Sequence, residues 1–367
     1  MPRKKILGAA IAVLCGAAGA EETTLPDIVV SATLSEHDTR TAPASVTVVT
    51  REELEMQNAV DLIDALRDAP GITLTPRSKV GGRKALALRG MDSKHTLTLI
   101  DGRRISASDD VVGHANFHYG WLPMVAIERI EIISGPMSTL YGSEALGGVL
   151  NLITRQPKER WTGSVAASGR AAASSANDAG GNGGSISVFT GGPVNDSLSL
   201  RVSGEHTRSS SVPRKEDPRY SEIEGREATI GSVGATLQLT REQRLEANWI
   251  GGSEQRFFDD VKDDDQRRYL NRYDLRRSHA SLAWNGEFGS WRGQLRAYRS
   301  EIDVSNGPTN GVTPTRPQNM NDQVFDGFAT TQVGAHALTA GGELRNESLA
   351  NSGLKNGNDS ARHQALF

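Results

Sequence analysis

After residue 158 the sequence alternates with a period of two, and this pattern constrains the fold more than any other feature. In one segment Leu198, Leu200 and Val202 stand between polar residues, and further along Leu295 does so as well. Because successive side chains of a strand point to opposite faces, each such segment has one apolar and one polar face. A sheet that lies between lipid and a wet lumen requires this arrangement.

The connections between the predicted strands distinguish a membrane barrel from a soluble sandwich, whose strands also alternate. Long and short connections follow each other in strict order, as do the long external loops and short periplasmic turns of an outer-membrane barrel. The predicted connections run over residues 170–184, 192–196, 207–226, 240–243, 255–276, 287–290, 302–322, 333–335 and 348–360. We therefore expect a transmembrane antiparallel β-barrel, of which this chain supplies roughly ten strands.

The N-terminus is typical of a secretory signal peptide over residues 1–20. A basic patch at 2–5 precedes an apolar run at 6–17, which is shorter than the ~20 residues of a bilayer-spanning helix. A small-x-small cleavage pattern follows at 18–20. Cys15, the one cysteine, lies inside this segment, so the mature chain should contain no disulfide, thiolate metal site or cysteine nucleophile.

The mature chain divides into a polar tail and two domains. Thr50 and Glu53 form a capping box that starts a helix. A second helix start at Asn58 is followed by a stop at Pro70-Gly71, and Asp101-Gly102 is the signature of a tight hairpin turn. We expect a flexible tail at 21–40, a compact mixed α/β domain at 41–157 and a partial barrel at 158–367.

One short apolar segment interrupts the polar tail. It reads Asp27, Ile28, Val29, Val30, Ser31, Ala32 and Thr33. Such a β-prone segment is either an ordinary edge strand or a peptide that a partner takes up by strand addition. The residues alone leave both interpretations open.

Residues 128–154 read ERIEIISGPMSTLYGSEALGGVLNLIT. This run closely resembles the end of the plug domain in TonB-dependent outer-membrane receptors. Three shorter motifs precede it in the family's order: APGI at 69–72, LRGM at 88–91 and LIDGRR at 99–104. With the tail segment, which resembles a TonB box, the resemblance extends over residues 27–157.

The resemblance implies a plug domain inside the barrel and a function in ligand import across the cell outer membrane. The wording of the long motif is most similar to catecholate ferric-siderophore receptors of the colicin I receptor and ferric enterobactin receptor kind. Cobalamin and haem receptors share much of the scaffold and remain alternatives. The implied partners are TonB with its inner-membrane energising complex, a ferric siderophore and outer-membrane lipid, and colicins or phage are further candidates.

Other classes of function find less support in the sequence. An exported enzyme would need a nucleophile and base such as a G-x-S-x-G motif provides, and none is found. A signal transducer would need a further domain before the tail segment. The net charge of −3 gives no indication of nucleic-acid binding. We expect no enzyme activity and no cofactor.

Several residues of the plug-like motif have a structural interpretation. Glycines let the backbone turn sharply and pack closely, and a proline fixes a turn. The structural candidates are Gly135, Pro136, Tyr141, Gly142, Gly147 and Gly148. Arg89 and Arg129 stand beside apolar strand residues, where a charge needs a partner. The resemblance implies acidic partners on the barrel wall, and Glu131 is a local alternative.

The ligand should meet outward-facing plug loops that carry guanidinium and aromatic groups, because ferric catecholates are anionic and aromatic-rich. Solvated loop charges are the alternative interpretation. The candidates are Arg77, Lys79, Arg83, Lys84, His114, Phe117, His118, Tyr119 and Trp121.

No metal site is expected. His114 and His118 have the spacing of a zinc pair on a helix, but the residues between them form no strong helix and no third ligand is evident. The acidic loop 259–265 lacks the glycine and terminal glutamate of a calcium loop.

The resemblance also implies a longer barrel. Such receptors close about 22 strands around the plug, so we expect the chain, which stops at Phe367, to end in mid-barrel as a fragment or truncated receptor. An open sheet edge in lipid leaves backbone groups unpaired. The 367-residue chain alone is therefore expected not to transport.

Overall fold

The computed structural model describes most of the two expected domains. The described residues are 28–29, 37–38, 45–57, 59, 61–76, 84–91, 93–105, 117–137, 141, 143–171, 180–262, 264–307, 317–334, 336–351 and 357–366. The predicted signal peptide and most of the tail lie outside them.

The N-terminal domain is built on a five-stranded sheet with the order β3-β8-β9-β6-β7. Strand β6 runs parallel to β9, and the other pairs are antiparallel. These strands are β3 (Ser45–Thr50), β6 (Thr96–Ile100), β7 (Arg103–Arg104), β8 (Ile127–Ser134) and β9 (Gly148–Thr154). Two short pairs accompany them: β1 (Ile28–Val29) with β2 (His37–Asp38), and β4 (Ile72–Pro76) with β5 (Lys84–Leu88).

Short helices connect these strands. They are α1 (Arg51–Met56), α2 (Leu62–Ala65), and the 3-10 turns η1 (Ser93–His95), η2 (Phe117–Gly120), η3 (Met124–Ala126) and η4 (Ser143–Ala145). The capping box of α1 is confirmed, because the Glu53 N–H donates to Thr50 and the Thr50 N–H donates to the Glu53 carboxylate. The predicted second start at Asn58 is wrong. Asp61 caps α2 instead, accepting from the Asp64 N–H at 2.8 Å.

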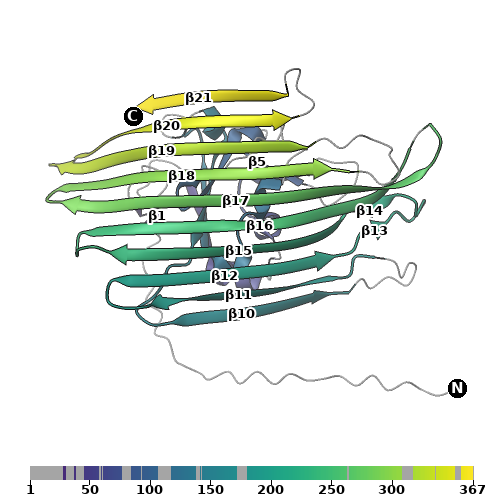
Figure 1. Ribbon diagram of the computed structural model, residues 1–367, viewed down its shortest axis with the longest axis horizontal. Coiled ribbons are helices and arrows are strands. Elements are labelled where there is room, and N and C mark those ends of the chain that lie inside the picture. The colour runs from purple at the N-terminus through teal and green to yellow at the C-terminus, as the bar shows by residue number, and fades with distance from the viewer. Residues whose placement is uncertain are drawn as a thin grey trace, which may run out of the picture.

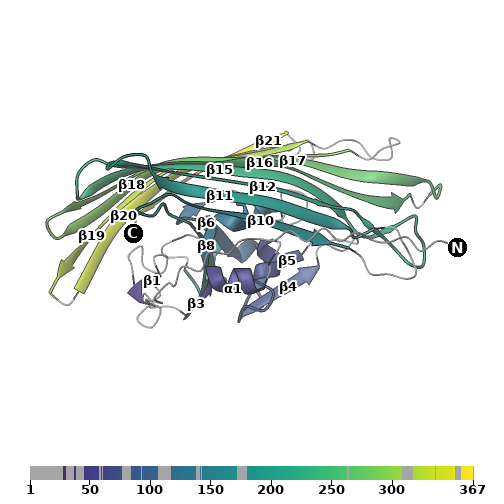
Figure 2. The same ribbon diagram turned by 90° about the horizontal axis from the view of Figure 1, so that it is seen from below.

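A ten-stranded antiparallel sheet follows, with the order β10-β11-β12-β15-β16-β17-β18-β19-β20-β21. Its strands are β10 (Thr162–Arg170), β11 (Gly183–Pro193), β12 (Leu198–Ser209), β15 (Gly225–Gln238), β16 (Gln243–Val261), β17 (Arg268–Phe288), β18 (Trp291–Asn306), β19 (Gln318–Val333), β20 (His336–Asn351) and β21 (Asn358–Leu366). A two-stranded ribbon, β13 (Val212–Pro213) with β14 (Ser221–Ile223), rises between β12 and β15. Figure 1 shows the strands side by side, and Figure 2 shows the N-terminal domain on the concave side of the sheet.

Long and short connections alternate as predicted, but several long ones are shorter than expected: the predicted loops 302–322 and 348–360 shrink to the residues between Asn306 and Gln318 and between Asn351 and Asn358. The predicted loop 255–276 is far shorter, because β16 continues to Val261 and β17 begins at Arg268. Cross-strand polar contacts stabilise this extension: the Tyr269 hydroxyl donates to Asp260 at 3.0 Å, and the Gln255 amide donates to Asp274 at 2.8 Å. Polarity was therefore a poor sign of a loop in this segment.

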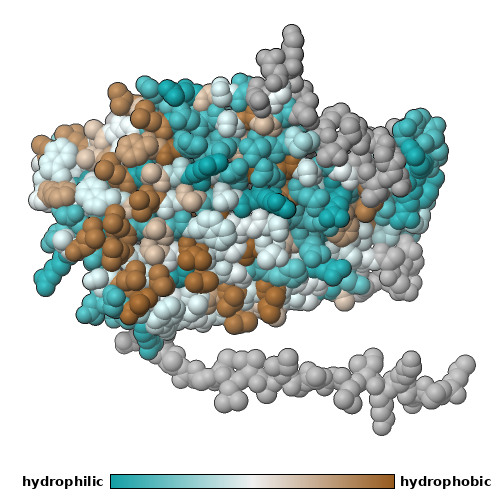
Figure 3. Space-filling view, viewed as in Figure 1, coloured by the Kyte–Doolittle hydropathy of each residue, from teal (hydrophilic) through white to brown (hydrophobic). Residues whose placement is uncertain are grey.

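The predicted faces of the large sheet are also confirmed. Arg201 and Ser203 are buried toward the N-terminal domain, whereas Val202 between them is exposed. Figure 3 shows brown side chains over the left and centre of the outer face and teal ones toward the end with the long connections. The exposed large apolar residues include Val165, Ile186, Val188, Val202, Val233, Trp249, Leu282, Leu295 and Phe325. None of the described helices has the length and hydropathy needed to cross a bilayer.

The main apolar core lies between the two domains. Leu88, Trp121 and Ile130 of the N-terminal domain share one cluster with Leu275 and Ile302 of the large sheet. A second cluster lies wholly within the N-terminal domain and comprises Leu97, Leu99, Ile133, Met137, Tyr141, Ala145 and Val149. The N-terminal domain therefore has apolar packing of its own besides its packing against the sheet.

We predict that residues 41–157 fold as a soluble unit, because the second cluster needs no residue of the large sheet. The isolated segment should melt cooperatively in far-ultraviolet circular dichroism and protect amides of β8 and β9 from exchange. Leu99→Ala should destabilise it by about 2–5 kcal/mol, since this side chain is fully buried. Glu52→Ala, at an exposed position of α1, is the control. Uniformly fast exchange without a cooperative melt would contradict the prediction.

Candidate functional site: the hairpin tip against the sheet

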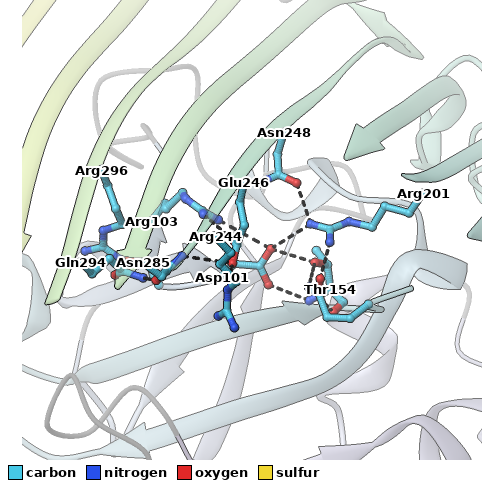
Figure 4. Close-up of polar contacts among 12 residues, drawn as sticks. Asp101, Arg103, Thr154, Arg201, Arg244, Glu246, Asn248, Asn285, Gln294 and Arg296 are labelled. Carbon is cyan, nitrogen blue, oxygen red and sulfur yellow. Dashed lines mark hydrogen bonds and ion pairs between the residues drawn. The ribbon is translucent and has the colours of Figure 1, made fainter. Parts of the chain in front are cut away.

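The turn between β6 and β7 points charged groups at the concave face of the large sheet. Asp101 and Gly102 both have positive φ, 49° and 72°, which is the geometry of a two-residue hairpin turn. The sequence Asp-Gly permits it, because glycine and aspartate tolerate this region better than other residues. Figure 4 shows the turn facing side chains from several strands of the sheet.

Asp101 is fixed within its own domain and faces an arginine of the sheet. Its carboxylate accepts from the Thr154 N–H at 2.9 Å and from the Thr154 hydroxyl at 2.7 Å. Arg201 of β12 and Arg103 each lie 3.8 Å from the same carboxylate. Arg201 also donates to Asn248 of β16 at 2.6 Å. The Asp101 carboxylate thereby connects the turn to Arg201 on β12 and, through Arg201, to Asn248 on β16.

Arg103 forms the second contact. Its guanidinium lies 3.4 Å from the Glu246 carboxylate of β16, and its side chain is only 4 % exposed. Glu246 in turn accepts from Arg244 at 2.8 Å and from the Asn285 amide at 3.2 Å. The glutamate is therefore shared between the turn and two neighbouring strands.

The backbone of the turn is held as well. Arg296 of β18 donates to the Gly102 carbonyl at 3.0 Å. Its other nitrogens donate to both carboxylate oxygens of Asp326 in β19, at 2.6 and 2.9 Å. This bidentate pair fixes the guanidinium in the plane from which it reaches the turn.

Arg104 connects the turn to the far side of the sheet. It lies 3.3 Å from Glu343 of β20 and 3.0 Å from Glu144 of η4, and it also donates to the Tyr141 carbonyl. Glu144 is shared with Arg345 of β20 at 3.4 Å. Burial raises the pKa of Tyr141 to about 12, so its hydroxyl stays neutral beside these charges.

A second polar contact between the two domains lies at η3, away from the hairpin turn. The Met124 N–H donates to Glu205 of β12 at 3.2 Å. Gly120 faces Arg226 and Glu254, and a side chain there would start 3.2 Å from both. Arg226 and Glu254 are themselves 2.9 Å apart. The N-terminal domain thus meets charged groups of the sheet at two places, the β6–β7 turn and the segment of η2 and η3.

Two predicted ligand-binding residues are buried in the core, which corrects their assignment. Tyr119 is 8 % exposed, and its hydroxyl accepts from the Leu86 N–H at 3.1 Å. Trp121 is 1 % exposed within the main cluster. Both side chains pack in the main cluster, which also contains Leu275 and Ile302 of the large sheet.

The other predicted ligand-binding residues are placed only in part. Lys84 opens β5 and is exposed. Phe117 and His118 belong to η2, whose backbone alone is described for them. Arg77, Lys79, Arg83 and His114 lie outside the described residues, as do five of the seven residues of the tail segment 27–33. Within it, Ile28 and Val29 pair with Asp38 and His37.

Of the two arginines expected to bind acidic groups of the wall, one has the local partner that was the alternative. Arg129 donates to Glu131 of its own strand at 2.7 Å, which is the local alternative. Arg89 is exposed with φ of 52°, and it makes no ion pair with the part of the sheet that the structure describes. Contacts of the expected kind, with carboxylates of the wall, are made by Arg103 and Arg104. A pair of arginines directly after a tight turn was the signal that could have identified them.

The structural glycines fall at tight places. Gly135 and Gly148 have φ of 132° and 145°, and a side chain at Gly148 would start 2.2 Å from the Ile133 carbonyl. At Gly147 a side chain would start 3.0 Å from the His95 carbonyl. Pro136 is exposed after Gly135. Gly142 lies outside the described residues.

An α/β domain seated by charged contacts on the concave, polar face of a ten-stranded antiparallel sheet has the architecture of a plug held against part of a β-barrel. Residues 38–149 match the family model of the TonB-dependent receptor plug domain. The chain belongs to the TonB-dependent outer-membrane receptors.

Individual relatives agree with this assignment. The chain is 35% identical over 328 residues to the iron-regulated outer membrane virulence protein of Vibrio cholerae, covering 84% of this chain and 46% of that protein. It therefore spans about half the length of the curated relatives it matches.

Solved structures show the same fold. A variant of the ferric enterobactin receptor PfeA from Pseudomonas aeruginosa superimposes with a TM-score of 0.73 at 21% identity, over 92% of this chain and 56% of that one. The siderophore receptor PirA from Acinetobacter baumannii gives 0.69 at 23% identity, over 83% and 48%.

We predict that Arg104→Met loosens the plug on the wall by about 3–5 kcal/mol, because it removes the buried cation that Glu144 and Glu343 share, although Glu144 keeps Arg345 as a partner. Amide exchange of β6 and β7 in urea would measure the change. Arg208→Met removes an exposed arginine paired 3.7 Å from Glu227 and is the control, with no expected change. Equal loosening by both substitutions would contradict the prediction.

Proposed function

We propose that this chain serves the TonB-driven import of a ferric siderophore, of the catecholate class, across the outer membrane. Its relatives support this: one is an iron-regulated outer membrane protein, one is a ferric enterobactin receptor and one is a siderophore receptor. The observation that carries the proposal is the hairpin tip, where ion pairs rather than apolar contacts join the plug to its wall.

The two ends of the plug support a direction of transport. In Figure 2 the pair β4 and β5 lies toward the long connections, whereas β1 lies toward the short ones. Long loops face outward and short turns face the periplasm in outer-membrane barrels. A ligand arriving from outside would meet the segment around Lys84, and TonB would meet the tail segment 27–33 from the periplasm.

The tail segment would transmit force to the plug. Ile28 and Val29 already pair as a strand, so their backbone groups have the geometry for strand addition to TonB. A pull on the tail acts on the plug, and the charged contacts of Asp101, Arg103 and Arg104 resist it. Water entering the interface can satisfy these groups once they separate, so the contacts can break and form again.

We predict that Val29→Pro abolishes import, because proline removes a backbone donor from the strand that TonB would pair with. The variant should still bind ligand at the cell surface. Uptake of labelled ferric catecholate and surface binding would be measured on the same cells, in a receptor with a complete barrel. Thr24→Pro, in the polar tail before the segment, is the control. Normal import by the Val29 variant would overturn the TonB-box assignment.

A further prediction tests the ligand class. Changing Arg77, Lys79, Arg83 and Lys84 together to glutamine should raise the Kd for an anionic ferric catecholate by about 10-fold to 100-fold, since charge-assisted contacts are lost. The Kd for a neutral hydroxamate complex should change little. Replacing Lys158 and Arg160, which are exposed in the link between β9 and β10, is the control for a loss of positive charge elsewhere. An equal effect on both ligands would argue against a catecholate.

A further inference from the structure

The hairpin of β4 and β5 forms a two-stranded sheet of its own beside the five-stranded sheet of the plug. A two-stranded hairpin is at best marginally stable in water, so it depends on contacts with its surroundings. Leu86 and Leu88 of β5 are fully buried in the main cluster. Apolar burial is non-directional, however, and does not alone fix how a strand is shifted or turned. A directional contact is needed for that.

Tyr119 of η2 supplies such a contact. Its hydroxyl accepts from the Leu86 N–H at 3.1 Å. Leu86 stands opposite Leu74 of β4, and its N–H points away from β4 to the other edge of the hairpin. In the part of the chain that the structure describes, no third strand pairs at that edge. The Tyr119 hydroxyl therefore takes the place of a carbonyl of a neighbouring strand.

The next residue, Gly120, rests on charged groups of the wall. A Cβ at Gly120 would lie 3.2 Å from both Arg226 Nη2 and Glu254 Oε2, and 3.6 Å from Arg277 Nη1. Glu254 is buried and lies 2.9 Å from Arg226 and 2.7 Å from Arg277. We call these three residues, which come from β15, β16 and β17, the wall platform. The turn fits closely on it because Gly120 has no side chain.

Three consecutive residues thus hold η2 and its end in three directions. Tyr119 binds the hairpin, Gly120 rests on the wall platform, and Trp121 is 1 % exposed in the main cluster. Since each contact limits the same short turn, the hairpin cannot shift relative to the wall without breaking one of them. This turn is therefore the junction between the hairpin and the wall.

We propose that Tyr119 is a positioning residue for ligand binding. Its hydroxyl holds β5 at a fixed place relative to the wall platform, and with it Lys84, the exposed first residue of that strand. A ligand that touches both plug and wall binds more tightly when the two are already at the right spacing, because less freedom is lost on binding. The inference rests on the proposed function, since that function brings the ligand to Lys84.

The test compares Tyr119→Phe with the unsubstituted receptor, both with a complete barrel. The change keeps the aromatic ring and its packing but removes the acceptor of the buried Leu86 N–H. The concentration of ferric catecholate that gives half-maximal uptake should rise about 3-fold to 10-fold, the range that one hydrogen bond covers. The maximal rate should stay the same. Amide exchange at Leu86 should become about tenfold faster.

A second variant tests the wall side of the same turn. Gly120→Ala places a methyl group against the paired Arg226 and Glu254, so the half-maximal concentration should rise about threefold. Two matched controls should leave uptake unchanged. Tyr141→Phe alters a buried tyrosine of the second cluster, and Gly204→Ala adds a Cβ 3.9 Å from its nearest neighbour. Heat-modifiable mobility checks that each variant is folded and present in equal amount.

The outcomes separate this inference from the proposed function. An unchanged half-maximal concentration in Tyr119→Phe would overturn the inference and leave the proposed function standing, provided that the unsubstituted receptor takes up ferric catecholate. A lower maximal rate at an unchanged half-maximal concentration would overturn it too, because Tyr119 would then serve folding or transport rather than binding. A lack of uptake by the unsubstituted receptor itself would sink both.

Discussion

The ion pairs between the β6–β7 turn and the large sheet determine how the plug sits in its wall. The turn is only two residues long, yet its Asp101 and the following Arg103 and Arg104 reach three strands of the sheet. Their partners are Arg201 on β12, Glu246 on β16 and Glu343 on β20. Because these strands are spread across the sheet, a rotation of the plug would break at least one contact. The turn therefore fixes orientation as well as position.

The proposed function requires the plug to move, and charged contacts suit such an element. A dry apolar contact loses its stabilisation when water enters, whereas a separated carboxylate and guanidinium regain hydration. The plug has both kinds of contact, since Leu275 and Ile302 of the wall also belong to its apolar cluster. Movement must expose those apolar groups, so a pull has to supply work even after the charges are hydrated. In the proposed function, this combination keeps the closed state stable without force and lets it open under a pull.

The sequence predicted those features that depend on neighbours along the chain. The faces of the strands follow from alternation, and the turn at Asp101-Gly102 follows from its dipeptide. The pairing of Arg103 with Glu246 joins residues 143 positions apart, and no local pattern contains it. The prediction that Trp121 binds ligand lacked the same long-range information. Its burial depends on a sheet that begins far along the chain, so composition near Trp121 could not reveal it.

Glycine shows most clearly what the sequence leaves undecided. Gly148 is required by its backbone, because it has positive φ and a side chain would collide with the Ile133 carbonyl. Gly231 has neither constraint, and its consequence is a hollow on the outer face. The two residues are identical in the sequence, and each stands in a strand. The backbone conformation and the atoms of the neighbouring strand distinguish Gly148, which the fold needs, from Gly231, where the fold would accept a side chain.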